Sequence, residues 1–152
     1  MQGQDSTVVQ KLSDLNTAFT AAQIERINKE SIYRELKGKP FDNYPDVRVN
    51  SLVQGLKQEF SARESEIKKK SQIFQDSYPE MQRLRSQQEG LQKRIESETA
   101  DIARKALNQS EAEYQAALKK ENYLVEMLNQ QKGSVVSSNA NAIYYNSLKI
   151  EV

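Results

Sequence analysis

The sequence predicts an all-α protein, an elongated antiparallel helical hairpin or coiled coil in which two shorter helices pack against one long helix. Between Pro79 and Lys132 the chain contains one glycine, Gly90, and no further proline, so nothing forces a long helix to end there. The chain before this stretch is interrupted twice, at residues 38–45 and at residues 78–79. Apolar residues recur at helical spacing in all three segments, which favours helices that share narrow apolar seams.

The first predicted helix covers residues 5–37. Asp5 or Ser6 can cap its start, because short polar side chains accept hydrogen bonds from the free backbone N–H groups of the first turn. Gly38 stands at the position that glycine often takes just after a helix, and Pro40 cannot continue the helix.

The apolar stripe of this first helix starts with heptad spacing and comprises Leu12, Leu15, Phe19 and Ala22. The same heptad would next place Arg26 and Lys29 in the seam. We therefore expect the apolar face to shift around the helix. The shifted face comprises Ile24, Ile27, Ile32, Tyr33 and Leu36.

Residues 38–50 form a structured break, since two prolines stand among turn-forming Asp and Asn residues. Three apolar residues can pack this break against the helices: Phe41, Tyr44 and Val47. A second helix is predicted over residues 51–75, with Asn50 or Ser51 as its N-cap. Its seam comprises Val53, Leu56, Phe60, Ile67 and Phe74.

The long helix is predicted over residues 79–132. Pro79 suits the first position of a helix, and the carboxylate of Glu80 suits its positive end. The first part of its seam comprises Met81, Leu84, Leu91, Ile95 and Ile102. The seam then shifts by about one residue and continues through Leu107, Tyr114, Leu118, Leu124 or Val125, and Leu128. Gly133 is expected to stop this helix, and residues 139–152 are expected to form a short return.

Helix lengths test this arrangement. At a rise of 1.5 Å per residue, about 52 residues after Pro79 give roughly 78 Å, and about 33 plus 25 residues before it give roughly 85 Å. Because the two lengths match, one continuous helix can pack along both shorter ones. Residues 1–152 are therefore predicted to form a single helical domain.

Composition excludes several classes of function. The 22 basic and 21 acidic residues give a net charge of +1, so no basic excess favours nucleic acid as a partner. The chain lacks histidine and cysteine, which removes His/Cys zinc sites, thiol nucleophiles and His-based triads. We predict a protein that is not an enzyme, with no catalytic, cofactor-binding or metal-binding residues and no cofactor.

Charged pairs at helical spacing indicate solvated helix faces. These pairs are Glu25/Lys29, Glu30/Arg34, Glu59/Arg63, Glu64/Lys68, Glu66/Lys70, Glu89/Lys93 and Asp101/Lys105. Residues 68–70, three lysines near the predicted hairpin tip, could instead attract an acidic saccharide or a lipid headgroup, although Glu64 and Glu66 stand beside them.

Three other motifs are better explained by structure than by function. Glu111 and Glu113 are two residues apart and so point away from each other on a helix, which argues against an acid–base pair. The Asn-Gln-Ser sequence at residues 108–110 matches a glycosylation sequon but falls inside the long helix. Residues 144–145, two tyrosines, are expected to pack at a helix end rather than to be phosphorylated.

Five stretches, taken in order and spacing, resemble a known family. They are AQIERI at 22–27, YREL at 33–36, NSLVQGLK at 50–57, YPEMQRLR at 78–85 and YNSLKIEV at 145–152. Together they look like the periplasmic helical region of the polysaccharide co-polymerase, or chain-length determinant, family, in the exopolysaccharide transport branch related to bacterial tyrosine autokinases. The resemblance covers most of the chain.

This resemblance implies a non-enzymatic scaffold at the periplasmic face of the bacterial inner membrane, acting in polysaccharide chain-length control and export. Its partners would be copies of itself, a polysaccharide polymerase and the export machinery. The chain would be a fragment of a longer membrane protein, whose flanking membrane segments lie outside it and which could carry or partner with a cytoplasmic tyrosine autokinase.

A second interpretation remains open from the residues alone. Helical hairpins also occur as generic coiled-coil interaction modules, such as an adaptor or the membrane-fusion-type hairpin of an efflux system. Membrane segments on both sides in the parent gene would favour the first interpretation, and lipoyl-like β domains would favour the second.

Overall fold

The computed structural model of this chain describes the backbone of residues 2–151 and the side chains of residues 6–134. Its elements are α1 (Gln2–Lys37), the short 3-10 helix η1 (Phe41–Asn43), α2 (Pro45–Arg48), α3 (Ser51–Lys70) and α4 (Pro79–Glu151). The described residues contain no strand. The predicted all-α fold, with two shorter helices packed against one long helix, is confirmed.

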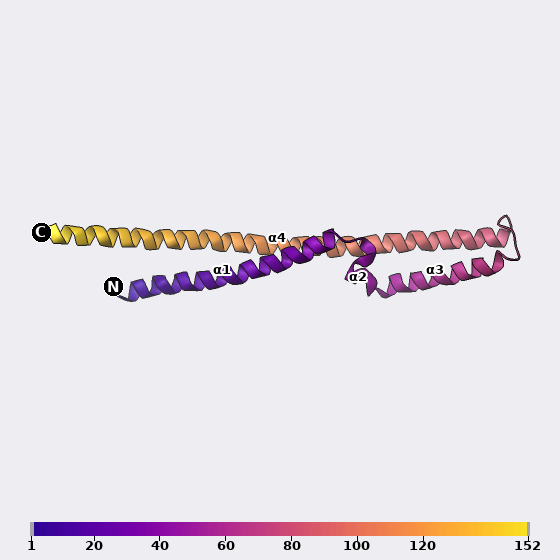
Figure 1. The fold of residues 1–152 in the computed structure, drawn as a ribbon, viewed down its shortest axis with the longest axis horizontal. Helices are drawn as coiled ribbons and strands as arrows, with labels where there is room; N and C mark the ends of the chain where they lie inside the picture. Colours follow the sequence, from indigo (N-terminus) through magenta and orange to yellow (C-terminus); the bar gives the residue numbers. More distant parts are fainter. Residues whose placement is uncertain (1, 152) are drawn as a thin grey trace. The chain divides into compact units, whose positions relative to one another are not determined.

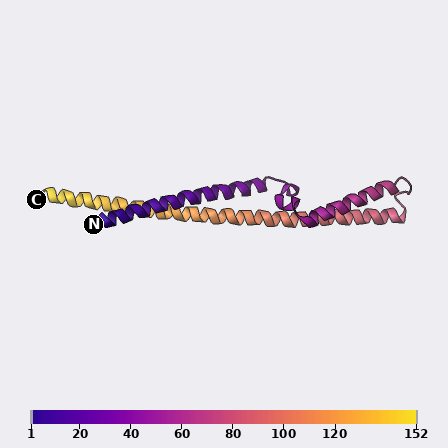
Figure 2. The ribbon, with the colours of Figure 1, turned by 90° about the horizontal axis from the view of Figure 1, so that it is seen from below.

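The chain divides into two compact units, where the sequence predicts a single domain. Unit 1 comprises Met1–Tyr33 and Glu111–Val152, and unit 2 comprises Arg34–Ser110. In unit 1, α1 runs beside the C-terminal part of α4, and in unit 2, α3 runs beside the N-terminal part of α4 (Figures 1 and 2). Within each unit the paired helices are antiparallel.

Unit 1 is held together by a narrow seam. Small residues sit at its centre, since Ala22 of α1 and Ala117 of α4 are both buried. The rings of Tyr33 and Tyr114 stack with centroids 5.7 Å apart, and Leu128 is buried further along α4. Alanines at such positions let two helices approach closely, so the seam buries little apolar surface per residue.

Unit 2 contains two hydrophobic clusters. The first is built from Tyr44, Val47, Val53 and Ala103, all at most 1% exposed, and Leu36, Phe41, Ile102, Ala106 and Leu107 pack against it. The second joins Ile67 to Met81 and Leu84, with Phe74 packed against them. The seam shift predicted between Ile102 and Leu107 coincides with the place where the break at residues 38–50 packs against α4.

Local signals in the sequence explain the starts of α3 and α4. The side chain of Asn50 accepts a hydrogen bond of 3.0 Å from the backbone N–H of Val53, so the predicted N-cap is confirmed. Pro79 is the first residue of α4, as predicted.

The second helix ends earlier than predicted. α3 stops at Lys70 and not at residue 75, and the chain turns through residues 71–78. Phe74 leaves the helix because its ring packs against the second cluster and stacks on Tyr78, with centroids 4.5 Å apart and ring planes 7° apart. The backbone N–H groups of Ile73 and Phe74 still find an acceptor in the Lys70 carbonyl.

Two predictions about the end of the chain are wrong. α4 does not stop at Gly133, and residues 139–151 continue the same helix instead of forming a return. A glycine inside a helix costs only about 1 kcal/mol relative to alanine, and no proline follows it to enforce a stop. The two tyrosines at residues 144–145 lie outside the residues whose side chains are described.

The ends of α1 also differ in detail from the prediction. α1 begins at Gln2, so Asp5 and Ser6 lie within the helix and do not cap it. It ends at Lys37 as predicted, but no glycine among the described residues has a positive φ, so Gly38 does not use the left-handed conformation typical of that position. The missing N–H of Pro40 accounts for the end of the helix.

The predicted shift of the apolar face of α1 is wrong for its three isoleucines, whereas Tyr33 and Leu36 do pack inward, on Tyr114 and on the first cluster of unit 2. Ile24, Ile27 and Ile32 are about half exposed, at 55%, 48% and 48%. The original heptad instead continues through Arg26 and Lys29, which are partly buried in the seam with α4. These charges are tolerated there because α4 supplies a carboxylate to each of them.

Candidate functional site

Ion pairs link residues 25–29 of α1 to residues 113–121 of α4 in unit 1. Arg26 donates hydrogen bonds to Glu121, with Nε to Oε2 at 2.5 Å, and to Glu30. Lys29 Nζ lies 3.2 Å from Glu113 Oε2. The hydrogen bonds to Glu121 and then to Glu30 raise the pKa of Arg26 above its ordinary value, so the guanidinium stays charged within the seam. These contacts fix the register of the two helices.

One predicted pair within a helix, Glu25/Lys29, is replaced by two pairs between helices. Glu25 pairs with Lys120 of α4 at 3.5 Å, and Lys29 pairs with Glu113. In unit 2, the predicted pairs Glu66/Lys70 and Glu89/Lys93 are confirmed, at 3.4 and 3.5 Å. The spacing of charges within one helix cannot show that a carboxylate on the facing helix takes the place of the predicted partner.

The face of α1 that points away from α4 carries exposed isoleucines. We call it the outer α1 stripe; its members are Ser6, Val9, Ser13, Thr17, Thr20, Ile24, Ile27 and Ser31. All eight are exposed, successive members are three or four residues apart, and none is charged. The α4 surface in the same unit mixes exposed charged residues, Glu111, Lys119 and Glu126, with exposed uncharged ones such as Tyr123.

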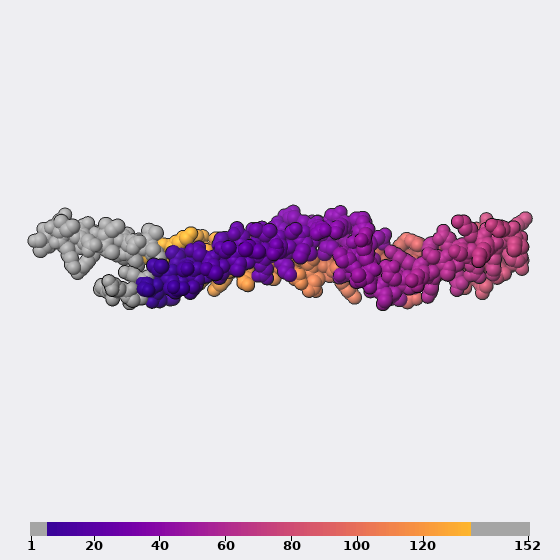
Figure 3. Space-filling view, turned by 60° about the horizontal axis from the view of Figure 1, so that its bottom comes forward, coloured from indigo at the N-terminus to yellow at the C-terminus, as the bar shows by residue number. Residues whose placement is uncertain are grey.

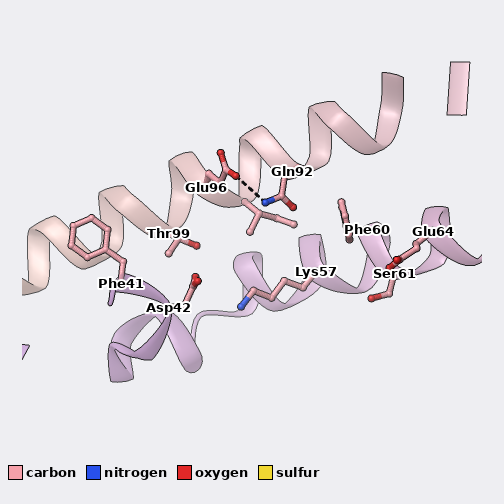
Figure 4. A pocket seen from close by; sticks show the side chains of 10 residues that line it. Phe41, Asp42, Lys57, Phe60, Ser61, Glu64, Gln92, Glu96 and Thr99 are labelled. Atoms are coloured by element: carbon pink, nitrogen blue, oxygen red, sulfur yellow. Dashed lines mark hydrogen bonds between the residues drawn. The ribbon is translucent and has the colours of Figure 1, made fainter. Parts of the chain in front are cut away.

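An open groove of about 570 Å³ lies in unit 2. Phe41 and Asp42 of η1, residues 57–64 of α3 and residues 92–99 of α4 line it (Figure 4). Its wall on α4 contains the buried Ile95 and Thr99, and the amide of Gln92 donates a 2.9 Å hydrogen bond to Glu96 at its rim. We call this feature the groove.

Thr99 is unusual among the residues of the groove. It is 5% exposed, and its hydroxyl has no hydrogen-bond partner among the described residues. Figure 4 shows the side chain directed into the space between α4 and α3, toward Asp42 and Lys57. A buried hydroxyl without a partner costs about 1–3 kcal/mol, so this position calls for an explanation.

The turn between α3 and α4 is fixed by charge as well as by ring stacking. Lys70 Nζ contacts Glu80, and Arg85 lies 2.8 Å from Asp76 Oδ1. The hydrogen bond to Glu80 raises the pKa of Lys70. Of the three lysines at residues 68–70, two remain exposed in the last turn of α3, where positive charge is favourable near the helix C-terminus.

The remaining predicted motifs do not converge on a site. Glu113 is engaged with Lys29, whereas Glu111 is exposed. Asn108 is exposed within α4, but Ser110, the hydroxyl residue of the sequon, is 6% exposed. Among the described residues no group of three or more His, Cys, Asp or Glu side chains could hold a metal ion.

Sequence reasoning missed both the outer α1 stripe and the groove. The stripe has a signal in the sequence, the absence of charge from one helical face over residues 6–31. Two of its members, Ile24 and Ile27, instead fall in the face that the sequence predicts to be buried. The groove has no such signal, because it depends on how η1 folds against α3 and α4.

Comparisons with models of known families, with curated proteins and with solved structures find no significant match for this chain. In the described residues no helix combines the length and the apolar character needed to cross a membrane.

Proposed function

We propose that this chain is the helical scaffold region of a polysaccharide chain-length determinant or exopolysaccharide export protein at the periplasmic face of the bacterial inner membrane. It acts by assembling with copies of itself and carries out no chemistry. Its partners in the parent protein are other copies, the polysaccharide polymerase and the export machinery.

The observation that carries the proposal is the outer α1 stripe. Ile24 and Ile27 are exposed on it, while the charged Arg26 lies in the seam with α4. A helix that faced only water on this side would gain nothing from isoleucine there. Figure 3 shows α1, in indigo, lying in front of α4, in orange. The stripe is therefore suited to contact with another helix.

A second copy of this chain is the occupant that the stripe fits best. Spacings of three and four residues are those of a coiled-coil seam, and residues 6–31 extend over roughly 38 Å of helix. Because the stripe has no charge, it can face itself across a two-fold axis without like-charge repulsion. Threonine and serine dominate its remaining positions, so the association should be weak and depend on concentration.

The resemblance in sequence supports the same function. Ile24 and Ile27 fall within the AQIERI stretch at residues 22–27, one of the five stretches that resemble the chain-length determinant family. In that family, oligomerisation of the periplasmic region accompanies control of polymer length.

The function can be tested in cells. In a strain that carries the double substitution Ile24→Gln and Ile27→Gln in the parent gene, we expect the length distribution of the exported polysaccharide to broaden, with the protein still produced at its normal level. The substitution Leu52→Gln, at an exposed position of α3, is the matched control and should leave the distribution unchanged. An unchanged distribution in the double variant, or a parent gene without membrane segments on either side of this region, would contradict the proposal.

A further inference from the structure

The turn between α3 and α4 presents an isoleucine to the solvent. Ile73 is 78% exposed and lies in the turn formed by residues 71–78. Its backbone is held in place, because its N–H group donates a 3.0 Å hydrogen bond to the carbonyl oxygen of Lys70. The next residue, Phe74, packs inward against the second cluster. The isoleucine therefore projects from a turn that is anchored on both sides of it.

Tyr78 adds an aromatic ring to the exposed surface of this turn. The ring stacks on Phe74 with nearly parallel planes, yet Tyr78 remains 45% exposed. Tyrosine combines an apolar ring with a polar hydroxyl, which suits the boundary between an apolar medium and water. Figures 1 and 2 show that the turn closes the end of the paired helices α3 and α4, so it forms one end of unit 2.

Positive charge surrounds the turn. Residues 63–85, which comprise the turn and about two helical turns on either side, contain six of the 22 basic and four of the 21 acidic residues of the chain. Lys68 and Lys69 are exposed in the last turn of α3. They take part in none of the ion pairs formed here, which engage three of the four carboxylates: Glu66–Lys70, Glu80–Lys70 and Asp76–Arg85. Two ammonium groups are thus available to an anionic partner.

The lysines have a local explanation, but the isoleucine does not. Positive charge in the last turn of α3 is favoured by the negative end of the helix. The side chain of Ile73, in contrast, contributes little to the fold, because most of its surface stays in contact with water. It would gain free energy only by entering an apolar phase outside the unit. The combination therefore fits a partner that is apolar inside and anionic at its surface.

A lipid bilayer that contains anionic lipid has both properties. A protein with an acidic surface fits less well, because a stable protein interface buries about 800 Å² and roughly 20–30 residues on each partner. The turn offers only residues 71–78 and the ends of two helices. A bilayer needs no preformed concave surface, since its headgroups move apart around a projecting side chain.

We infer that the turn between α3 and α4 docks on a bilayer surface that contains anionic lipid. Ile73 enters the interfacial layer, Tyr78 lies at its boundary, and Lys68 and Lys69 meet the lipid phosphates. A single isoleucine and two lysines give weak, reversible binding. The inference rests on the turn alone and does not depend on the proposed function.

Insertion of the turn can be measured by fluorescence. The chain contains no tryptophan, so Ile73→Trp introduces a single reporter. With vesicles of equal parts phosphatidylcholine and phosphatidylglycerol, its emission should shift to shorter wavelength and be quenched by lipids with brominated acyl chains. Vesicles of phosphatidylcholine alone should change it little, and high salt should reverse the shift.

Val49→Trp is the matched control, because Val49 is 82% exposed elsewhere in unit 2. Its emission should not respond to either kind of vesicle. An unchanged emission of Ile73→Trp with the anionic vesicles, or an equal response of the two variants, would overturn the inference. Ile73→Trp combined with Ile24→Gln and Ile27→Gln should still respond, so membrane docking and self-association are tested separately.

Cosedimentation with the same vesicles measures the contribution of each side chain. Ile73→Ser should weaken binding about tenfold, and Val49→Ser should leave it unchanged. The double substitution Lys68→Gln and Lys69→Gln should weaken binding at least about tenfold, since one lysine near an anionic surface contributes about fivefold. All four positions are exposed, so the variants should fold, and circular dichroism checks this.

A second pair of basic residues controls for net charge. Arg104 and Lys105 are exposed on α4, about 25 residues or roughly 38 Å from its start. Arg104→Gln with Lys105→Gln should bind the vesicles like the unmodified chain. An equal loss in the two double variants would show that the turn is not the contact. Binding of the unmodified chain to polyglutamate and not to vesicles would assign the turn to an acidic protein and overturn the inference as well.

Discussion

Tyr44 anchors the break between α1 and α3, because its side chain is 1% exposed in the first cluster of unit 2. The ring also meets Phe41 edge to face, with centroids 5.5 Å apart. Burial raises the pKa of its phenol above the ordinary value of 10.0, since ionisation would place a charge among Val47 and Val53. The burial of Tyr44 therefore makes the stability of unit 2 depend on pH.

This link predicts a loss of stability in alkali. When the pKa of a group is higher in the folded than in the unfolded state, its contribution to stability is fully present at pH values below the unfolded pKa. This contribution is lost as the pH rises through the folded pKa. The free energy of unfolding should therefore decline above about pH 10, and Tyr44→Phe should decline less steeply. Urea unfolding across this pH range measures the effect.

Tyr123→Phe is the matched control, because Tyr123 is exposed on α4. It should follow the unmodified chain at every pH. If the Tyr44 and Tyr123 variants showed the same pH dependence, the burial of Tyr44 would not be its source.

At the scale of elements, α4 is a single helix that partners different segments along its length. In unit 2 it packs first against α3 through the second cluster and then against η1 and α2 through the first cluster. In unit 1 it packs against α1. Glycines occur within it at positions 90 and 133, and neither has another group within 4 Å of the place a Cβ would take.

Gly90→Ala should therefore stabilise the protein. Gly90 is exposed in the helix interior, so alanine lowers the entropy of the unfolded chain without a steric cost. We expect a gain of roughly 0.5–1 kcal/mol in the free energy of unfolding, read from thermal and urea transitions. Gly90→Pro at the same site should instead lose about 3 kcal/mol or more, because it interrupts the helix. A destabilising Gly90→Ala would show that this part of α4 is not a regular, uncrowded helix.

The reversal between α3 and α4 depends on Tyr78 and Pro79. The Tyr78 ring stacks on Phe74, and Pro79 fixes the start of α4. Replacing both with alanine should weaken the reversal and favour a continuous helix or a domain-swapped dimer. Small-angle scattering and sedimentation report the change. An unchanged monomer with an unchanged scattering curve would mean that the Lys70–Glu80 and Arg85–Asp76 pairs suffice to hold the turn.

Local chemistry determined which elements could be predicted. Proline and capping signals placed the end of α1 at Lys37 and the starts of α3 and α4, since these depend on a few neighbouring residues. The end of α3 depends on the contact of Phe74 with α4. The exposure of Ile24 depends on two carboxylates of α4, which lie 84 residues from Lys29 and 95 residues from Arg26 and neutralise these two cations in the seam. Contacts of that range are not visible in helical periodicity.

At the scale of the molecule, the two units are packed differently: unit 2 buries large apolar residues such as Met81 and Leu84, whereas the seam of unit 1 combines ion pairs and small residues with few large apolar ones. Ala22, Ala103 and Ala117 are buried at the helix contacts, while isoleucines remain on the outer α1 stripe. In a chain with only 37% hydrophobic residues, apolar side chains left on the surface are therefore a notable feature. Exposed apolar residues in a patterned stripe are typical of an interaction surface.

Sedimentation equilibrium over a series of protein concentrations tests this central claim most directly. The unmodified chain should associate reversibly as concentration rises. The double variant Ile24→Gln and Ile27→Gln should remain monomeric over the same range, with unchanged helical content by circular dichroism, while Leu52→Gln should associate like the unmodified chain. A chain that is monomeric throughout, or a double variant that associates as strongly as the unmodified chain, would contradict self-assembly through the outer α1 stripe.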